Sequence, residues 1–354
     1  MSSKIISINL VVYNGEKYLQ HCLESVFEQT YDHELIELNI WDNASTDSTV
    51  SIVENLKPRI NESKFKKFNF IKSTKNLGMW PAQEELLTYS TGEYVIVLSV
   101  DVILDKDFIK NGVETMERDQ KIGALQARVY KYGMLVMNGE PRIEKTNTID
   151  TLGFKIFRSR RIVNVGHGEK DNEQFNIKKE IFAVEGAVPF FRRQALDDCR
   201  LKTQGNKIID HDYFWYGDDL DLPWRMRMFG WKQIYDPGVI AWHDRKTTKN
   251  LAEGKIKEFI KIRKTVPLFK RRLDWRNTTL TIIKNDFTEN IFSDLPHILW
   301  RQIRLWGYFL LFEPIMILEI FKVARLLPRM LKRRREIMKK ANISPEEFRR
   351  WIRS

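Results

Sequence analysis

The chain has 354 residues, of which 43% are hydrophobic and 30% charged, so it is long enough to bury a large core and its composition argues against global disorder. The net charge of +12 is uneven: residues 246–354 hold 26 Lys and Arg against 11 Asp and Glu, whereas residues 1–245 hold 33 against 36. A nucleic-acid-binding protein would spread positive charge over its folded body. We therefore expect a near-neutral catalytic body with a basic appendage.

The cysteines and the N-terminal residues indicate a protein of a reducing compartment. Cys22 and Cys199 cannot build a disulfide framework and have no zinc-site spacing. The apolar run over residues 5–12 is interrupted by Ser7 and Asn9 and no cleavage site follows, so it indicates a strand rather than a signal peptide. No uncharged apolar stretch reaches about 18 residues, and no membrane-spanning helix is expected.

Through residue 130, short apolar runs alternate with helical patterns, which is typical of a parallel sheet covered by helices in an α/β fold. Strands are predicted over residues 5–12, 35–41, 68–72, 94–98 and 122–130. Helices are predicted over residues 16–29, 49–56, 81–89 and 106–118.

Between residues 131 and 179 the pattern weakens, and we expect loops and short strands there. Order returns with an apolar segment over 181–191, followed by a loop leading into a helix over 213–229 and a strand within 231–242. Beyond residue 246 the chain is predicted to be helical and basic.

Polar side chains follow three strands of the predicted sheet. Residues 13–15 follow the first strand, residues 42–47 the second, and residues 99–102 the fourth. Ligands bind at the carboxyl ends of the strands in open parallel sheets. Asp, Asn, Ser and Thr are also ordinary turn and cap residues, but three such loops on one sheet edge favour a binding site.

Asp101 comes directly after the uncharged run 94–100, a place where a carboxylate often receives a metal. Mg²⁺ or Mn²⁺ would suit carboxylate and phosphate oxygens. The alternative is that Asp101, like Asp105, only caps the next helix. This segment by itself leaves both readings open.

The densest acidic cluster lies further on, at Asp218, Asp219 and Asp221. Three carboxylates within four residues repel one another unless they are solvated, paired or metal-bound, so they can hold a proton acceptor at a tuned pKa. Bulky neighbours such as Trp215 and Trp224 argue against a merely solvated acidic turn.

His243 ends a predicted strand, where it is either a hydrogen-bonded structural residue or a metal ligand. The dipeptides His211-Asp212 and His243-Asp244 leave open a metal-dependent phosphohydrolase. The chain has no P-loop and no GxSxG motif, and Gly-His-Gly at 166–168 lacks the third glycine of a dinucleotide fingerprint.

Taken in order, these motifs resemble glycosyltransferase family 2 over roughly residues 4–290. The chain looks most like the rhamnosyltransferase-type enzymes of bacterial cell-surface polysaccharide assembly. The resemblance is carried by Val12-Tyr13-Asn14-Gly15, Asp42-Asn43 with Ser45 and Asp47, Asn76-Leu77-Gly78, Asp101, Gly186 with Arg192-Arg193, residues 217–222 with Arg225, and Trp242-His243.

The resemblance implies a GT-A fold over residues 1–245, with a nucleotide-binding half over about 1–130 and an acceptor half over about 131–245, followed by a helical basic region over 246–354. It implies inverting, Mg²⁺- or Mn²⁺-dependent transfer of a sugar such as rhamnose. The donor would be a dTDP- or UDP-linked sugar, and the acceptor a lipid-linked saccharide.

It also implies roles for individual residues. Asp101 and His243 would hold the metal, and Asp219 would be the general base. On the nucleotide-sugar side stand Tyr13, Asn14, Asp42, Asn43, Asn76, Gly78 and Ser99. On the donor-sugar or acceptor side stand Gly186, Asp218, Asp221 and Arg225. Two positions depart from the family pattern: Ser99 replaces the first Asp of a DxD motif, and Asp218 replaces a Glu.

The basic end mixes aromatic and aliphatic residues with Arg and Lys over 299–340, a composition typical of helices that lie in a membrane interface and attract anionic lipids. We therefore expect a cytoplasmic enzyme, peripheral on the inner face of the cell membrane. The alternatives are packing on the catalytic body or on a second subunit in a homodimer. Nucleic-acid binding is the other alternative, but no recognised motif supports it.

Overall fold

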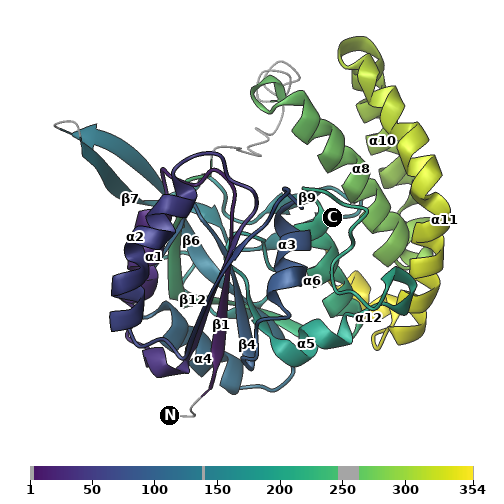
Figure 1. Cartoon of the computed structure of the whole chain (residues 1–354). Helices are drawn as coiled ribbons and strands as arrows, with labels where there is room; N and C mark the ends of the chain where they lie inside the picture. Colours follow the sequence, from purple (N-terminus) through teal and green to yellow (C-terminus); the bar gives the residue numbers. More distant parts are fainter. Residues whose placement is uncertain (1–3, 138–139, 246–262, 354) are drawn as a thin grey trace.

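The computed structural model describes residues 4–137, 140–245 and 263–353, and it shows a large mixed sheet with helices on both faces (Figure 1). The strands of the main sheet lie in the order β10-β12-β6-β11-β4-β1-β2-β3, with β5 paired to β12 and β7 to β6. Their bounds are β1 Ile6–Val12, β2 Ile36–Asp42, β3 Lys67–Lys72, β4 Tyr94–Ser99, β5 Val102–Leu104, β6 Ile122–Met137, β7 Glu140–Thr151, β10 Lys179–Glu180, β11 Phe190–Arg192 and β12 Lys232–His243. A smaller sheet contains β8 Phe154–Phe157, β9 Ile162–Asn164 and β13 Ile352–Arg353.

The α/β class is confirmed, and the first half follows the predicted alternation closely. The helices of the body are α1 Leu19–Phe27, α2 Thr49–Glu62, α3 Met79–Leu86, α4 Phe108–Glu117, α5 Arg193–Asp198 and α6 Asp218–Met228. Strand β1 pairs in parallel with β2 and with β4, and every residue of β1 and β2 is buried. Both faces of these strands are covered, and their buried polar residues pair with one another: Ser7 donates to Glu37, and Asn39 donates to Asn9. The carboxyl ends of β1, β2 and β4 therefore lie at one sheet edge.

The segment expected to hold only loops and short strands contains instead a long antiparallel hairpin. Strand β6 continues to Met137 and pairs with β7, and the hairpin projects from the body at the upper left of Figure 1. In β7 the only apolar residues besides Pro141 are Ile143 and Ile149, so no alternation reveals the strand. Its ladder of backbone hydrogen bonds needs no apolar pattern where both faces meet solvent.

The C-terminal third is helical, as predicted. It contains α8 Leu268–Asn285, α9 Thr288–Ser293, α10 Leu295–Phe312, the short 3₁₀ helix η3 Pro314–Met316, α11 Ile317–Lys340 and α12 Pro345–Arg349. None of the helices in the described ranges has the length and apolar character that a bilayer crossing requires.

The end of this helical region belongs to the core of the catalytic body. Phe348 is completely buried and stacks on Trp224, with ring centroids 5.7 Å apart, and it also contacts Phe182 edge to face. Strand β13 pairs with β8. The helices therefore do not form a separate appendage, because the last residues of the chain close the core around α6. The predicted boundary at residue 245 adjoins residues outside the described part of the chain.

Candidate active site

The loops after β1 and β2 are joined by hydrogen bonds at the carboxyl edge of the sheet. Asn14, in a left-handed conformation with φ of 49°, accepts from the Thr46 amide at 2.8 Å and donates its own amide to Ser45 Oγ at 2.9 Å. The Gly15 amide donates to Thr49 Oγ1 at 2.8 Å. Tyr13 remains half exposed beside them. Two loops predicted separately thus form one surface.

Asn43 connects this surface to the loop after β3. Its amide nitrogen donates to Asn76 Oδ1 at 2.9 Å and to the Gly78 carbonyl at 3.2 Å, and its oxygen accepts from the Leu77 amide at 2.8 Å. Asn43 is buried, so the structure shows it supporting the loop rather than facing outward. Asp42, at the end of β2, accepts from the Ser45 amide at 3.2 Å.

Gly78 brings this loop against a distant part of the chain. It has a φ of 89°, and a Cβ atom there would lie 2.3 Å from the Phe214 carbonyl oxygen. A larger residue would therefore strain the backbone and push the two loops apart. Phe214 belongs to the loop that leads to Asp219, so the loop after β3 and the acidic loop are in contact.

Asp101 and His243 lie side by side at the end of β4. His243 Nε2 lies 3.4 Å from Asp101 Oδ1, and the Asp244 amide donates to the Asp101 carbonyl at 3.1 Å. His243 is buried on β12, whereas the Asp101 side chain is 32% exposed. Ser99 lies at the end of β4, half-buried, where a DxD motif would have a carboxylate.

Behind His243 lies an ion network that the sequence did not reveal. Asp150, on β7 and completely buried, accepts from His243 Nδ1 at 2.9 Å and from Arg245 Nε at 3.0 Å. Arg245 also donates to Glu185 at 2.6 Å. His167, from the Gly-His-Gly segment, lies 2.6 Å from the Asp150 carbonyl through Nδ1. The projecting hairpin thus supplies a carboxylate to the site.

The charges around His243 explain the pKa values of the three groups. Burial by itself would lower the pKa of His243, but the carboxylates of Asp101 and Asp150 on either side raise it to about 10. Burial would raise the pKa of Asp101, but His243 outweighs it and lowers that pKa. The pKa of Asp150 lies far below its ordinary range, because Arg245 and the two histidines outweigh its burial. Both carboxylates are therefore ionised at neutral pH.

Asp101 and His243 fit the chemistry of a divalent cation. An oxygen and an imidazole nitrogen face each other at the open edge of the sheet, and a bound cation would take the place of the proton on His243 Nε2. Asp150 would orient the imidazole by accepting from Nδ1, as carboxylates behind metal-bound histidines do. In the described ranges, no three His, Cys, Asp or Glu side chains gather around one point. Asp101 and His243 would be the ligands from the described residues, which suits a cation that completes its shell with phosphate oxygens and water.

Asp219 lies in the first turn of α6, directly after a turn with two left-handed residues, Tyr216 (φ 65°) and Gly217 (φ 82°). Its Oδ1 accepts from the Gly217 amide at 3.1 Å. A Cβ atom on Gly186 would lie 2.6 Å from the Asp219 Cβ, so glycine at 186 makes room for this carboxylate. The side chain of Asp218 lies outside the described part of the structure.

The expectation that Asp221 and Arg225 line the sugar or acceptor side is wrong. Arg225 Nη2 donates to Asp221 Oδ2 at 3.0 Å, and Lys284 Nζ lies 2.9 Å from Asp221 Oδ1. All three side chains are at most 2% exposed. On a helix, residues two positions apart point about 200° apart, so Asp221 faces inward when Asp219 faces the site. The ion pair between Asp221 of α6 and Lys284 of α8 stabilises the packing of these two helices.

The His-Asp dipeptides do not form the site of a phosphohydrolase. Asp212 pairs with Arg329 and Arg333 of α11, at 2.7 and 2.6 Å, whereas Asp244 accepts from the Tyr18 hydroxyl at 2.7 Å. The two carboxylates are engaged by different elements, and the described residues hold no cluster of three metal-ligating side chains.

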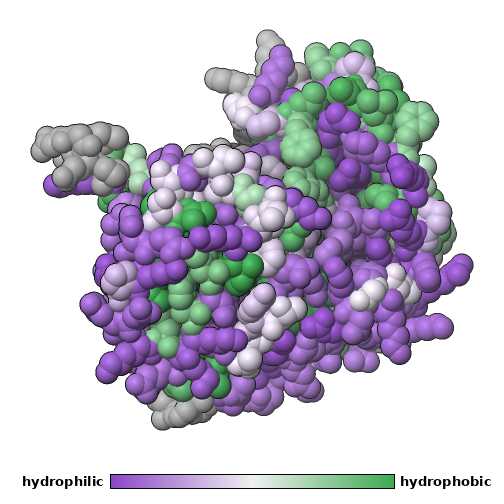
Figure 2. All heavy atoms as spheres, in the orientation of Figure 1, coloured by the Kyte–Doolittle hydropathy of each residue, from purple (hydrophilic) through white to green (hydrophobic). Residues whose placement is uncertain are grey.

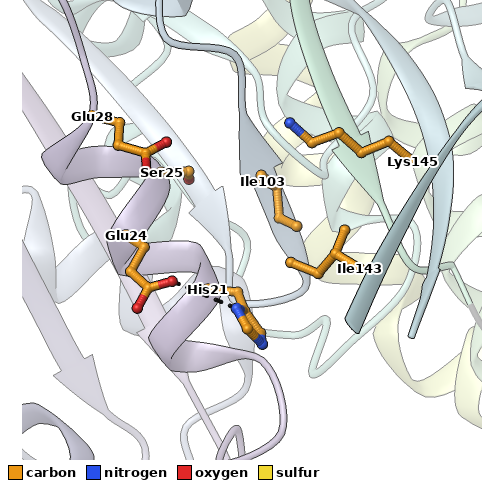
Figure 3. Close-up of a pocket in the computed structure, with 7 residues that line it drawn as sticks. All are labelled: His21, Glu24, Ser25, Glu28, Ile103, Ile143 and Lys145. Atoms are coloured by element: carbon orange, nitrogen blue, oxygen red, sulfur yellow. Dashed lines mark ion pairs between the residues drawn. The ribbon is translucent and has the colours of Figure 1, made fainter. Parts of the chain in front are cut away.

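A hollow of about 320 Å³ lies between α1 and the strands β5 and β7 (Figure 3). Its lining includes His21, which pairs with Glu24 at 3.6 Å, and Lys145. None of the predicted site residues lines it, and we assign it no function.

Comparison with known proteins identifies the fold first. A solved mannosyltransferase from Pyrobaculum calidifontis, in complex with GDP-Man and Mn²⁺, superposes with a TM-score of 0.52 at 16% identity, covering 97% of this chain and 87% of that one. The expected GT-A fold is thereby confirmed. The glycosyl transferase family 2 model matches residues 7–199, and the chain belongs to this family.

Two curated relatives share parts of the sequence. A Methanococcus voltae protein named dolichyl N-acetyl-alpha-D-glucosaminyl phosphate 3-beta-D-2,3-diacetamido-2,3-dideoxy-beta-D-glucuronosyltransferase is 32% identical over 116 residues, which are 33% of this chain and 35% of that protein. Poly-beta-1,6-N-acetyl-D-glucosamine synthase of Staphylococcus epidermidis is 25% identical over 237 residues, 67% of this chain and 49% of the synthase. The chain thus spans about half or less of the length of these relatives.

Proposed function

We propose that the protein is a metal-dependent, inverting glycosyltransferase that moves a sugar from a nucleotide-diphospho-sugar to a lipid-linked saccharide. The observation that carries the proposal is the pairing of Asp101 with His243 at the carboxyl edge of β4, in a chain of glycosyl transferase family 2. A carboxylate and an imidazole at this edge suit a cation bound to a diphosphate.

The donor would lie over the loops after β1, β2 and β3. Tyr13 and Asn14 would face the nucleotide, and Asp42, buried at the end of β2, would contact it only at the edge of this surface. The hydrogen bonds of Asn43 to Asn76 and Gly78 keep these loops in place. The structurally similar mannosyltransferase holds GDP-Man and Mn²⁺, which supports a nucleotide-sugar donor with a divalent cation. A dTDP- or UDP-linked donor, and rhamnose as the sugar, remain predictions from the sequence resemblance.

Asp101 and His243 would hold the metal, Mg²⁺ or Mn²⁺, which when bound stabilises the negative charge of a departing diphosphate. Asp150 would keep His243 oriented by accepting from Nδ1. Ser99, a neutral residue, leaves Asp101 as the one carboxylate of this loop.

Asp219 would be the general base. Its carboxylate would take the proton of the acceptor hydroxyl while that oxygen forms a bond to the anomeric carbon and the bond to the diphosphate breaks on the opposite face. Attack from the face opposite the leaving group inverts the anomeric centre. Gly186 and Asp218 would border the reacting sugars, and the close contact of Gly186 with Asp219 supports this placement.

The acceptor would reach the site from a membrane. The name of the Methanococcus relative specifies a dolichyl-linked acceptor, which supports a lipid-linked saccharide here. The carboxyl ends of the strands and the turn between α10 and α11 lie on the same, upper side of Figure 1. We call α10, η3 and α11 the helical hairpin, and Figure 2 shows hydrophobic side chains gathered at its upper end.

The helical hairpin exposes apolar side chains near its tip, and the charged side chains that it exposes are basic. The exposed apolar side chains near the tip are Leu310, Leu311, Phe312, Ile315, Leu318, Ile320 and Phe321. Leu299, Trp300 and Ile303, near the start of α10, are exposed as well. The acidic residues of the hairpin, Glu313, Glu319 and Glu336, are turned inward to Arg263, Arg272 and Thr203. The exposed charged residues are Arg304, Lys322, Arg325, Arg329, Lys332, Arg335 and Lys339.

Such a surface favours an anionic bilayer over a second copy of the chain, because two identical positive surfaces repel each other. We therefore propose a peripheral enzyme on the cytoplasmic, inner face of the cell membrane. A homodimer through the same tip is the competing interpretation.

A panel of nucleotide sugars tests the proposed activity. With Mn²⁺ or Mg²⁺ present, one donor should raise the melting temperature and be hydrolysed or transferred. Asp219→Asn should bind that donor like the wild type but lose at least about 100-fold in turnover, as expected for a lost general base. The control is Asp198→Asn, an exposed carboxylate at the end of α5, which should stay active. Normal turnover by Asp219→Asn would refute its role.

A further inference from the structure

A side chain of the C-terminal helices holds the turn that precedes Asp219. Asn277, on α8 and completely buried, donates through its Nδ2 to the carbonyls of Trp215 and Tyr216, at 2.9 and 2.6 Å. Tyr216 has a left-handed φ of 65° and Gly217 one of 82°. A left-handed residue other than glycine persists only where its surroundings hold it. Asn277 provides this support by binding two successive carbonyls of the turn.

The 215–217 turn determines how the Asp219 carboxylate is held. The Gly217 amide donates to Asp219 Oδ1 at 3.1 Å, and the Gly217 carbonyl accepts from the Asp221 amide at 3.0 Å, which begins α6. A Cβ atom on Gly217 would lie 2.9 Å from the Asn277 Cβ, so α8 approaches the backbone as closely as glycine allows. The position of the carboxylate therefore depends on the position of α8.

The contact is part of a continuous polar stripe on α8. One turn after Asn277, Thr281 donates to the Tyr213 hydroxyl at 3.2 Å, and Asn285 donates to Asp221 Oδ1 at 2.8 Å. Residues spaced by four lie on one helix face, and all three side chains are completely buried. Each of the three side chains donates a hydrogen bond to the 213–221 segment, which indicates that this face of α8 is built to hold that segment.

We infer that Asn277 is a positioning residue for Asp219, so that the C-terminal helical region completes the active site. The inference rests on the proposed function, which makes Asp219 the general base. It assigns the helices a second task besides the membrane surface of the helical hairpin: α8 holds the base in place through the 215–217 turn.

Asn277→Ala tests this inference, with Asn290→Ala as the matched control. Asn290 is also buried in the helical region, on α9, and its Nδ2 donates to the Pro345 carbonyl at 2.9 Å, away from the turn. Two readouts are compared in the full-length chain. Hydrogen exchange reports the amide of Gly217, and steady-state kinetics with the donor found in the nucleotide-sugar panel report kcat and KM.

Asn277→Ala should speed exchange of the Gly217 amide about tenfold or more, since the turn loses both supports. It should lower kcat by up to about 100-fold, the effect of misplacing a reacting group by about 1 Å, and leave the KM for the donor unchanged. Asn290→Ala should change neither. Should Asn277→Ala fail to fold, Gly217→Ala disturbs the same contact from the other side and should give the same pattern.

Unchanged exchange at Gly217, or a loss of kcat equal to that of Asn290→Ala, would overturn the inference. Faster exchange with normal kcat would also overturn it, because the turn would then not govern the base. If the wild type turned over no donor of the panel, that result would refute both the proposed function and the catalytic part of the inference. Hydrogen exchange would still decide whether Asn277 holds the turn.

Discussion

Serine in place of Leu310, Leu311 and Phe312 should release the protein from anionic membranes. These side chains end α10 at the tip of the helical hairpin and are 59, 77 and 53% exposed. Complete burial of such a side chain stabilises by about 2 kcal/mol, so burying these exposed fractions in a bilayer would contribute about 4 kcal/mol in all. Since about 1.4 kcal/mol is a tenfold change, the triple variant should partition about a thousandfold less onto vesicles.

Co-sedimentation with vesicles that contain phosphatidylglycerol measures this partition. Ile177→Ser is the matched control, because Ile177 is 73% exposed but lies on the body, outside the helical hairpin. It should bind like the wild type. Each basic residue near an anionic surface contributes about 1 kcal/mol at physiological ionic strength, so binding should weaken steeply with added salt.

Equal vesicle binding by the wild type and the triple variant would refute the membrane reasoning. Failure of the wild type to bind these vesicles would refute it as well. If the triple substitution instead converted a dimer into a monomer, with vesicle binding unchanged, the tip would be an interface between two copies of the chain.

Asp101→Ala should abolish Mn²⁺ binding followed by electron paramagnetic resonance, and an unchanged titration would remove Asp101 from the metal site. Asp150→Asn should weaken Mn²⁺ binding about 10- to 100-fold, because the imidazole of His243 is then held less firmly. The control is Asp171→Asn, which removes a carboxylate paired with an arginine at 2.7 Å and should leave Mn²⁺ binding unchanged. Equal affinities of the two variants would show that Asp150 is not needed. Burial alone would raise the pKa of Asp294, but hydrogen bonds from Arg160 and two further arginines lower it from 3.8 to about 2. Asp294 therefore stabilises the fold by about 2 kcal/mol above pH 4 and loses this contribution as the pH falls through 2. In urea unfolding, the stability difference between the wild type and Asp294→Asn should shrink by that amount between pH 4 and pH 2, and a constant difference would contradict the assignment.

The sequence by itself determined the parallel half of the sheet and the outer elements of the site. The apolar residues of β1 and β2 recur within short segments that end in polar loops, and this local pattern predicts strands even though Ser7, Asn9, Glu37 and Asn39 interrupt it. Because parallel strands end at one edge, the polar residues after them predict a common site without any coordinates. The pairing of His243 with Asp101 was implied only by the resemblance to glycosyltransferase family 2, and in the structure the two side chains lie 3.4 Å apart.

Only the tertiary structure decided which polar residues face the site and which support it. Asp219 and Asp221 are two positions apart in one acidic cluster, yet helical geometry sends Asp221 inward to Lys284. Asp150 lies on β7, in the hairpin that β7 forms with β6. The sequence of β7 shows no alternation of apolar residues, so it did not predict this strand. Asn277 is 58 residues from Asp219 in the sequence, and only the packing of α8 against the 215–217 turn brings it there. Hydrogen bonds between segments that are distant in the sequence produce no recognisable residue spacing, because they depend on how the helices pack in the folded protein.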